Sequence, residues 1–335
     1  MKKLYTLLLL ASLTNFFAQT YIPFTGTGAL NANGWTVHSG TAGQTLILST
    51  PSDSGTSLSF NGLAASTGNR TSMVAGNGED LNFAVPTPLT GVVYFSALIK
   101  VLDATQLDLN SSIGSYGLAL TNAATATTTT FQARIYTKQG TTPNTFSVGV
   151  LNNSGGTAAP SYISTGLAVN TTHLLVVKFD LATNIASLFV NPTPGSSEPA
   201  ASATNSTGTT VAPTQIAGFV IRQVGTVTTG SGNVEVDEIR VGNSFSQVTP
   251  ANLSVNQNQI AGLNINPNPV SKGVFYVNTT ANETKNVVVV DLLGKQVLNT
   301  TTSGNEINVS NLNVGVYIVK VTEEGKTATR KLVIQ

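Results

Sequence analysis

The 335-residue sequence contains no cysteine, which excludes a disulfide framework and any thiolate metal site. It has two histidines, His38 and His173, and they form no H-x-x-x-H pair of the kind that binds zinc. No serine lies in a G-x-S-x-G turn, so the sequence shows no nucleophilic triad. A domain made from this sequence must therefore rely on its hydrophobic core for stability.

Charge is also scarce in this chain. Charged residues make up 9% of it, the formal net charge is +1, and no Lys/Arg cluster lies outside the N-terminus. We therefore expect no nucleic-acid partner and no polybasic membrane patch. Hydrophobic residues make up 41%, which argues against disorder, and Thr, Ser, Asn and Gly supply the polarity. This composition is typical of a β protein whose outward faces carry Thr and Asn.

No amphipathic helical period is found from residue 19 to about residue 249. Short runs rich in β-branched and aromatic residues recur there between Gly, Asn, Ser and Pro clusters. This pattern predicts an all-β sandwich or jelly roll. Residues 174–177 are apolar on both faces, which predicts a central, buried strand. In residues 131–138 the alternation places Phe131, Ala133 and Ile135 on one face.

Residues 1–18 have the features of a signal peptide. Lys2 and Lys3 precede an apolar run, and the predicted cleavage site follows Ala18. The run is too short to cross about 30 Å of hydrocarbon, and no other stretch is longer, so we predict no transmembrane segment. We expect export to the periplasm.

The last part of the chain carries several motifs in a fixed order. A Pro-Asn-Pro triplet is followed by D-L-L-G-K at residues 291–295, by residues 312–321, and by a basic residue before an apolar end. In this order they resemble the type A C-terminal sorting domain of the Bacteroidetes type IX secretion system. The residues that carry the sorting signal are then Pro267, Asn268, Pro269, Gly294, Gly315, Tyr317 and Lys331.

This resemblance implies a small immunoglobulin-like β-sandwich of about seven strands, with the two prolines in its first edge strand. It also implies that an outer-membrane translocon reads the tail, and that a surface peptidase removes it with attachment to anionic lipopolysaccharide. The expected location is therefore the medium or the outer-membrane cell surface. An ordinary adhesive immunoglobulin-like module is the alternative.

The middle of the chain resembles the concanavalin A-like (laminin-G-like) jelly rolls. The resemblance is carried by Gly34-Trp35 and by residues 93–98, 131–136, 173–180, 186–192, 221–223 and 236–242. It implies a two-sheet sandwich with a concave face that often binds carbohydrate and a rim that sometimes binds calcium. The expected domains are a signal peptide (1–18), a jelly roll (19–249), a linker (250–262) and a sorting domain (263–335).

Residues 235–238, Glu-Val-Asp-Glu, are the best catalytic candidates. Laminarinase-like hydrolases of this fold carry similar carboxylates on one strand, and Glu235 and Asp237 share a face. Glu238 should point to the other face unless a bulge intervenes, the third carboxylate is absent, and no tryptophan lies nearby. We therefore prefer a structural interpretation, in which Asp237 and Glu238 pair with Arg134, Arg222 or Arg240, and we assign no catalytic residue.

Two further groups are binding candidates. Asp53, Asn77, Glu79 and Asp80 offer oxygen ligands for Ca²⁺, although they lack D-x-D-x-D spacing and solvated loop carboxylates are the alternative. Four aromatic residues offer a stacking platform for sugars, with ordinary packing as the alternative; they are Trp35, Tyr116, Tyr136 and Tyr162. No cofactor other than calcium is expected. The chain is thus a non-catalytic binding or adhesion protein, a glycoside hydrolase, or a passive surface protein.

Overall fold

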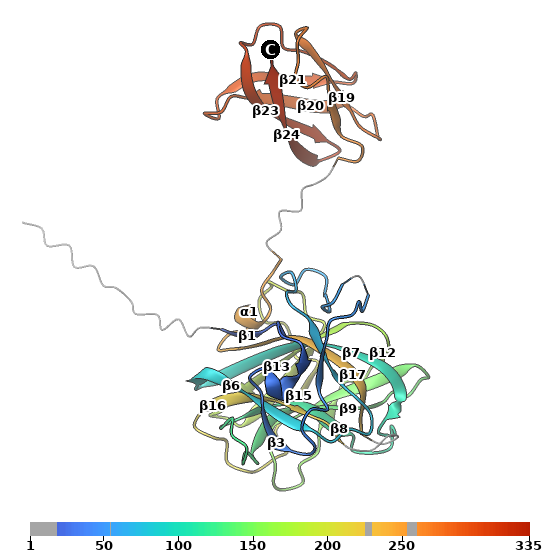
Figure 1. Ribbon diagram of the computed structural model, residues 1–335, viewed down its shortest axis with the longest axis vertical. Helices are drawn as coiled ribbons and strands as arrows, with labels where there is room; N and C mark the ends of the chain where they lie inside the picture. Colours follow the sequence, from blue (N-terminus) through green and yellow to red (C-terminus); the bar gives the residue numbers. More distant parts are fainter. Residues whose placement is uncertain (1–18, 54, 225–229, 253–259) are drawn as a thin grey trace, which may run out of the picture. The chain divides into compact units, whose positions relative to one another are not determined.

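A computed structural model describes residues 19–53, 55–224, 230–252 and 260–335 (Figure 1). The predicted signal peptide and most of the predicted linker lie outside these residues. The chain divides into two compact units, Met1–Asn252 and Leu253–Gln335, and the division falls within the predicted linker. The described residues contain no helix long and apolar enough to cross a membrane.

The first unit contains two large antiparallel sheets (Figure 1). Sheet A has the order β15 (Ala203–Asn205), β14 (Ile185–Val190), β13 (His173–Asp180), β7 (Val92–Leu107), β17 (Ser231–Gly242), β5 (Arg70–Met73), β4 (Leu46–Leu48) and β2 (Gly28–Ala29), with β1 (Thr20–Ile22) paired to β17. Sheet B has the order β11 (Ser161–Tyr162), β10 (Thr145–Leu151), β9 (Phe131–Gln139), β8 (Ser115–Thr121), β16 (Ile216–Arg222), β6 (Asp80–Leu89) and β3 (Thr36–Ser39), with β12 (Leu167–Ala168) paired to β10. The predicted all-β sandwich is confirmed.

The main core lies between the two sheets. Alternate residues of each strand point inward, as the two-residue period of a strand requires. Phe95 of β7 meets Phe219 of β16 edge to face, with ring centroids 5.3 Å apart. Leu175 and Val177 of β13 join the same core. The sandwich is therefore held together by inward-facing side chains of strands that are distant in sequence.

Sheet A also buries its outer face. Leu174 and Val176 point away from the main core into a second hydrophobic cluster, which confirms the strand predicted to be buried on both faces. Leu58 and Leu63 cover this cluster from residues 55–68, which we call the covering segment. The short helix α1 (Phe245–Val248) adds Phe245 and is held by a capping box between Ser244 and Gln247.

The prediction for residues 131–138 is only partly right. Ala133 and Ile135 lie in the core, but Phe131 contacts His38 and Tyr116 instead. The β8–β9 ladder shifts register because β9 has one extra residue between Gln132 and Ile135, and Ala133 has φ 51°. A one-residue insertion reverses the alternation, so Phe131 moves to the opposite face of sheet B.

The second unit is the predicted small immunoglobulin-like sandwich. One sheet has the order β18 (Asn264–Asn266), β19 (Val274–Asn278) and β22 (Glu306–Asn308). The other has the order β21 (Gln296–Thr302), β20 (Lys285–Val290), β23 (Gly315–Glu323) and β24 (Lys326–Ile334). Phe275, Val287, Val319 and Leu332 are fully buried between them. Pro267 and Pro269 follow the edge strand β18 rather than lying in it.

Candidate functional site

Glu235 lies on the outer face of sheet A and is almost completely buried. Its Oε1 lies 2.7 Å from Nε of Arg70, and its Oε2 accepts a hydrogen bond of 2.7 Å from the Ser52 hydroxyl. The Arg70–Glu235 approach is a charge contact rather than a linear hydrogen bond. Nearby, Nζ of Lys100 lies 2.6 Å from Oδ1 of Asp53. The two carboxylate oxygens of Glu235 are therefore already paired within the protein, one with a buried arginine and the other with a serine.

Asp237 lies under the covering segment and is 0% exposed. Its two oxygens accept hydrogen bonds from the main-chain N–H of Leu58 (2.8 Å) and of Glu238 (2.7 Å). Burial raises the pKa of Asp237 to about 8, with the neighbouring Glu238 carboxylate adding to the effect of burial. Asp237 thus anchors Leu58 to sheet A and is closed off from solvent.

Glu238 lies in a β-bulge, the alternative that the sequence analysis did not decide. The β7–β17 ladder gains one residue on β17 between Asp237 and Arg240, and Glu238 has φ 52°. The Glu238 carboxylate accepts hydrogen bonds of 2.5 Å from Arg240 and from the Tyr21 hydroxyl, and one of 3.2 Å from Thr67 N–H. Of the three arginines predicted as partners, Arg240 is the one that pairs here.

The three carboxylates proposed for calcium are not brought together. Glu79 accepts hydrogen bonds from the N–H of Gly43 (2.7 Å) and Thr45 (2.6 Å) and is 0% exposed. Asp80 accepts hydrogen bonds from two other protein groups, and Asp53 pairs with a lysine. Over the described ranges, no three acidic or histidine side chains form a group able to hold a metal ion. These residues do not fit a calcium site.

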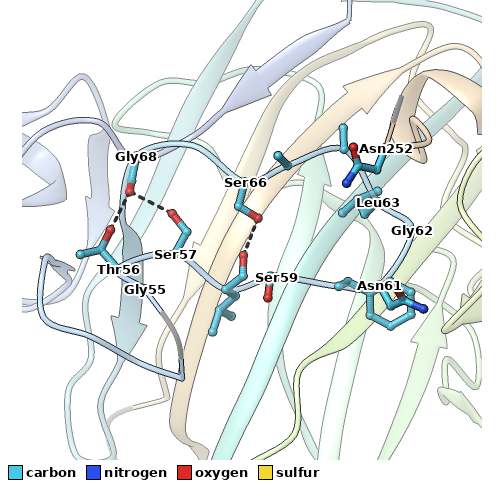
Figure 2. A pocket seen from close by; sticks show the side chains of 14 residues that line it. Gly55, Thr56, Ser57, Ser59, Asn61, Gly62, Leu63, Ser66, Gly68 and Asn252 are labelled. Carbon is cyan, nitrogen blue, oxygen red and sulfur yellow. Dashed lines mark hydrogen bonds between the residues drawn. The ribbon is translucent and has the colours of Figure 1, made fainter. Parts of the chain in front are cut away.

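The covering segment lines an open pocket of about 660 Å³ (Figure 2). Its two arms are joined by hydroxyl groups: Thr56 and Ser57 both donate to the Gly68 carbonyl (3.0 and 2.9 Å), and Ser66 donates to the Leu58 carbonyl (2.5 Å). The residues that line the pocket include no ionisable side chain. General acid–base catalysis has no group to use there.

Trp35, the first candidate for sugar stacking, is a packing residue. It is 4% exposed and lies against Phe24 and Phe83, with ring centroids 6.1 and 5.4 Å away. It also lines a small cavity of about 240 Å³ together with Tyr21. Most of the ring is therefore unavailable for stacking on a ligand.

Tyr116 and Tyr136 lie side by side on the outer face of sheet B. They are directly opposite in the β8–β9 ladder, and their rings are 5.5 Å apart. Phe131 continues the row, 6.1 Å from Tyr116 and 5.4 Å from the His38 ring. We call these four side chains the aromatic row. Burial raises the pKa of Tyr116 and lowers that of His38, which favours the neutral imidazole.

Cationic side chains lie against these rings. The guanidinium of Arg222 is 4.5 Å from the centre of the Tyr116 ring, and that of Arg134 is 5.2 Å from it. Lys138 Nζ lies 4.4 Å from the centre of the Tyr162 ring. Such cation–π contacts hold the charges in place while leaving part of each cation available to a ligand.

These cations have few acidic partners. Arg222 lies 3.7 Å from Asp80, but Arg134 and Lys138 have no carboxylate within ion-pair distance in the part of the chain that the structure describes. Arg134 donates to the Phe131 carbonyl at 3.0 Å, and Lys138 donates to two main-chain carbonyls at 2.7 and 3.2 Å. The outer face of sheet B therefore combines aromatic rings with an excess of positive charge.

Sequence reasoning treated Arg134 and Arg222 only as carboxylate partners and missed this combination. The signal was present in residues 131–138, where alternation places Arg134, Tyr136 and Lys138 on one face. Tyr116 was harder to place because Gly117 is an extra residue in β8 that changes the register beside it.

In the second unit, the predicted sorting residues lie in the connection after β18, in the turn after β20, and in strands β23 and β24. The Asn268 side chain donates to the Lys331 carbonyl (2.8 Å) and accepts from Val333 N–H (2.9 Å), which ties the Pro-Asn-Pro triplet to β24. Gly294, with φ +83°, completes the turn after β20. Gly315 opens β23.

Two sorting residues remain: Lys331 lies in β24 and is exposed, and Tyr317 in β23 is 8% exposed, with its hydroxyl donating to the Asn313 carbonyl at 2.8 Å. This bond closes the loop that leads into β23. The sorting motifs are therefore structural devices that fix the ends of strands.

Residues 264–335 match the family described as "Secretion system C-terminal sorting domain". A search of curated proteins finds no match to the sequence. Solved structures similar to this chain include a sialidase, at 11% identity over 68% of this chain and 18% of that chain (TM-score 0.34). They also include the VIP36 exoplasmic/lumenal domain in its Ca²⁺/Man-bound form, at 10% identity over 63% and 82% (TM-score 0.32). A third is the Emp46p carbohydrate recognition domain, at 9% identity over 67% and 95% (TM-score 0.36). These TM-scores are too low to transfer any property to this chain.

Proposed function

Because the chain carries a type IX secretion sorting domain at residues 264–335, we propose that its first unit acts outside the cell as a non-catalytic glycan-binding module. The match supports export to the cell surface or the medium. The carboxylates that a hydrolase would need, Glu235 and Asp237, are buried and bonded to protein groups: Glu235 to Arg70 and Ser52, and Asp237 to the covering segment through Leu58 N–H. The positions of these two side chains favour binding over catalysis.

Tyr116 and Phe131, the two more exposed members of the aromatic row, carry this proposal, because Tyr136 is 8% exposed and the His38 side chain 4%. The C–H faces of sugar rings stack on aromatic side chains, and Tyr116 is only partly buried. Arg134, Lys138 and Arg222 lie beside these rings and offer N–H donors to hydroxyl or carboxylate groups. Since two of these cations lack a carboxylate partner among the described residues, a glycan that bears uronate or sulfate groups fits the face better than a neutral one.

The test is a glycan array with purified residues 19–335, in buffers with and without Ca²⁺, and with neutral and acidic glycans. Tyr116→Ala should weaken binding about tenfold or more, the loss expected for a stacked ring. Arg134→Gln should weaken binding of acidic glycans and leave neutral ones unchanged.

The matched control is Tyr276→Ala, which removes a tyrosine that is 41% exposed on the second unit. If residues 19–335 bind no glycan in either buffer, or if Tyr116→Ala binds as the wild type does, the proposal is wrong.

A further inference from the structure

The outer face of the four-stranded sheet in the second unit is unusually apolar for a surface. Val288, Val290, Val316, Ile318 and Val333 point away from the core of this unit and are only partly buried. The register places Val290 beside Ile318, and Val316 beside Val333. They therefore form a continuous apolar stripe across β20, β23 and β24.

The turn after β20 extends this stripe with two leucines. Leu292 is 71% exposed and Leu293 is 95% exposed. The turn is tightly held: Oδ1 of Asp291 accepts hydrogen bonds of 2.9 Å from the N–H of both Leu293 and Lys295. Gly294 supplies the positive φ that the turn requires. The motif D-L-L-G-K thus builds a rigid turn that presents two leucines to solvent.

Val314 lies at the same end of the sheet and is 76% exposed. The ladder pairs Val290 with Ile318 and Gly315 with Ile334, so the turn after β20 and the loop before β23 both project from this end. The Tyr317 hydroxyl holds that loop through the Asn313 carbonyl. Both sorting motifs therefore fix a backbone that displays apolar side chains.

Positive charge borders this surface. Lys320 and Lys331 are exposed and point outward from β23 and β24, and Lys295 ends the turn. Two rigidly presented leucines beside an apolar stripe form a patch of the kind that marks a protein contact. The partner follows from the sorting-domain match, because a sorting domain acts by contact with the secretion machinery.

We propose that the type IX export machinery binds this chain through the surface formed by Leu292, Leu293, Val314 and the adjoining apolar stripe. The matching surface on the machinery is an apolar groove bordered by carboxylates. Burial of the two leucines accounts for about 100-fold in affinity, from the transfer energy of apolar side chains. The proposal is independent of what the first unit binds.

The first test compares full-length chains expressed in the native host. Leu292→Ser combined with Leu293→Ser keeps every hydrogen bond of the turn, because these bonds use main-chain N–H groups. We expect at least a tenfold fall in the extracellular fraction and accumulation in the periplasm, with an unchanged melting temperature of the purified chain. The matched control, Tyr276→Ser, changes an exposed side chain on the other sheet and should be exported normally.

The second test does not depend on these substitutions. A photo-crosslinking residue at position 293 should join the chain to an outer-membrane component of the export machinery, and one at position 276 should not. Crosslinks to residues of the first unit, or to a second copy of the chain, would overturn the proposal. Normal export of the double serine variant would overturn it as well.

Discussion

Replacing Glu235 with glutamine tests how much its buried ion pair with Arg70 stabilises the first unit. The substitution keeps the size of the side chain and removes its negative charge. Arg70 then stays buried, with a side chain 4% exposed, and loses the carboxylate that lies 2.7 Å from its Nε. Since an unpaired buried charge is unfavourable, we expect the first unit to lose stability.

The magnitude follows from the surroundings of Arg70. Removing one partner of a buried ion pair costs about 3–5 kcal/mol. Nη1 of Arg70 also donates to the carbonyls of Thr50 (2.5 Å) and Thr56 (3.0 Å), and these bonds remain in the variant. We therefore expect the lower end, about 3 kcal/mol, a large part of the 5–15 kcal/mol that stabilises a typical domain.

The assay is urea unfolding followed by tryptophan fluorescence. Trp35 is the only tryptophan in the chain, lies in the first unit and is 4% exposed, so its emission reports unfolding of that unit alone. The midpoint for Glu235→Gln should fall by about 1 M or more. The control is Glu198→Gln, whose ion pair with Lys178 is about one-third exposed and contributes about 1 kcal/mol or less.

Two results would refute this reasoning. One is a midpoint for Glu235→Gln that equals that of the control. The other is a double variant, Arg70→Met with Glu235→Leu, that is as unstable as Glu235→Gln alone, because removing both charges should restore most of the stability.

Two further predictions concern pH and the sorting turn. The pKa of Asp237 is about 8 in the folded state and 3.8 in the unfolded state, so the folded state binds the proton more tightly. The free energy of unfolding should therefore fall as pH rises from 3.8 to 8, by up to about 1.4 kcal/mol per pH unit. Urea midpoints at pH 5 and pH 8 should differ less in Asp237→Asn than in the wild type; an equal difference would contradict the assignment. Gly294→Ala should destabilise the second unit by about 1 kcal/mol, since φ is +83° and a Cβ meets no atom within 4 Å. Thermal melting of that unit checks this, and an unchanged melting temperature would show that the turn relaxes without strain.

The sequence predicted the tail well because its motifs are themselves structural devices. Asp291 and Gly294 form a turn that few other residue pairs can form, so the turn can be recognised from the sequence motif alone. The continuous apolar run at residues 174–177 was equally informative, because a strand apolar on both faces needs cover on both.

The burial of Glu235 and Asp237 was not predictable in the same way. A carboxylate on a strand has the same local pattern whether it faces a cleft or lies under a loop. The covering segment has no hydrophobic periodicity that indicates where it packs. The hydrogen bond from Leu58 N–H to Asp237 joins residues that are 179 positions apart in the sequence. The bulges at Gly117 and Glu238 add single residues that alternation cannot anticipate.

The two outer faces of the first unit should therefore respond differently to substitution. On sheet A, the charged side chains are buried and bonded, so Glu235→Gln should lower the free energy of unfolding and leave glycan affinity unchanged at a temperature where the unit is folded. On sheet B, Arg134 is partly exposed, so Arg134→Gln should lower affinity for acidic glycans with little effect on the Trp35 unfolding midpoint. Measuring both quantities for each variant separates the faces. If Glu235→Gln instead reduces affinity in the folded unit while its urea midpoint is unchanged, binding takes place on sheet A and the aromatic row is ordinary packing.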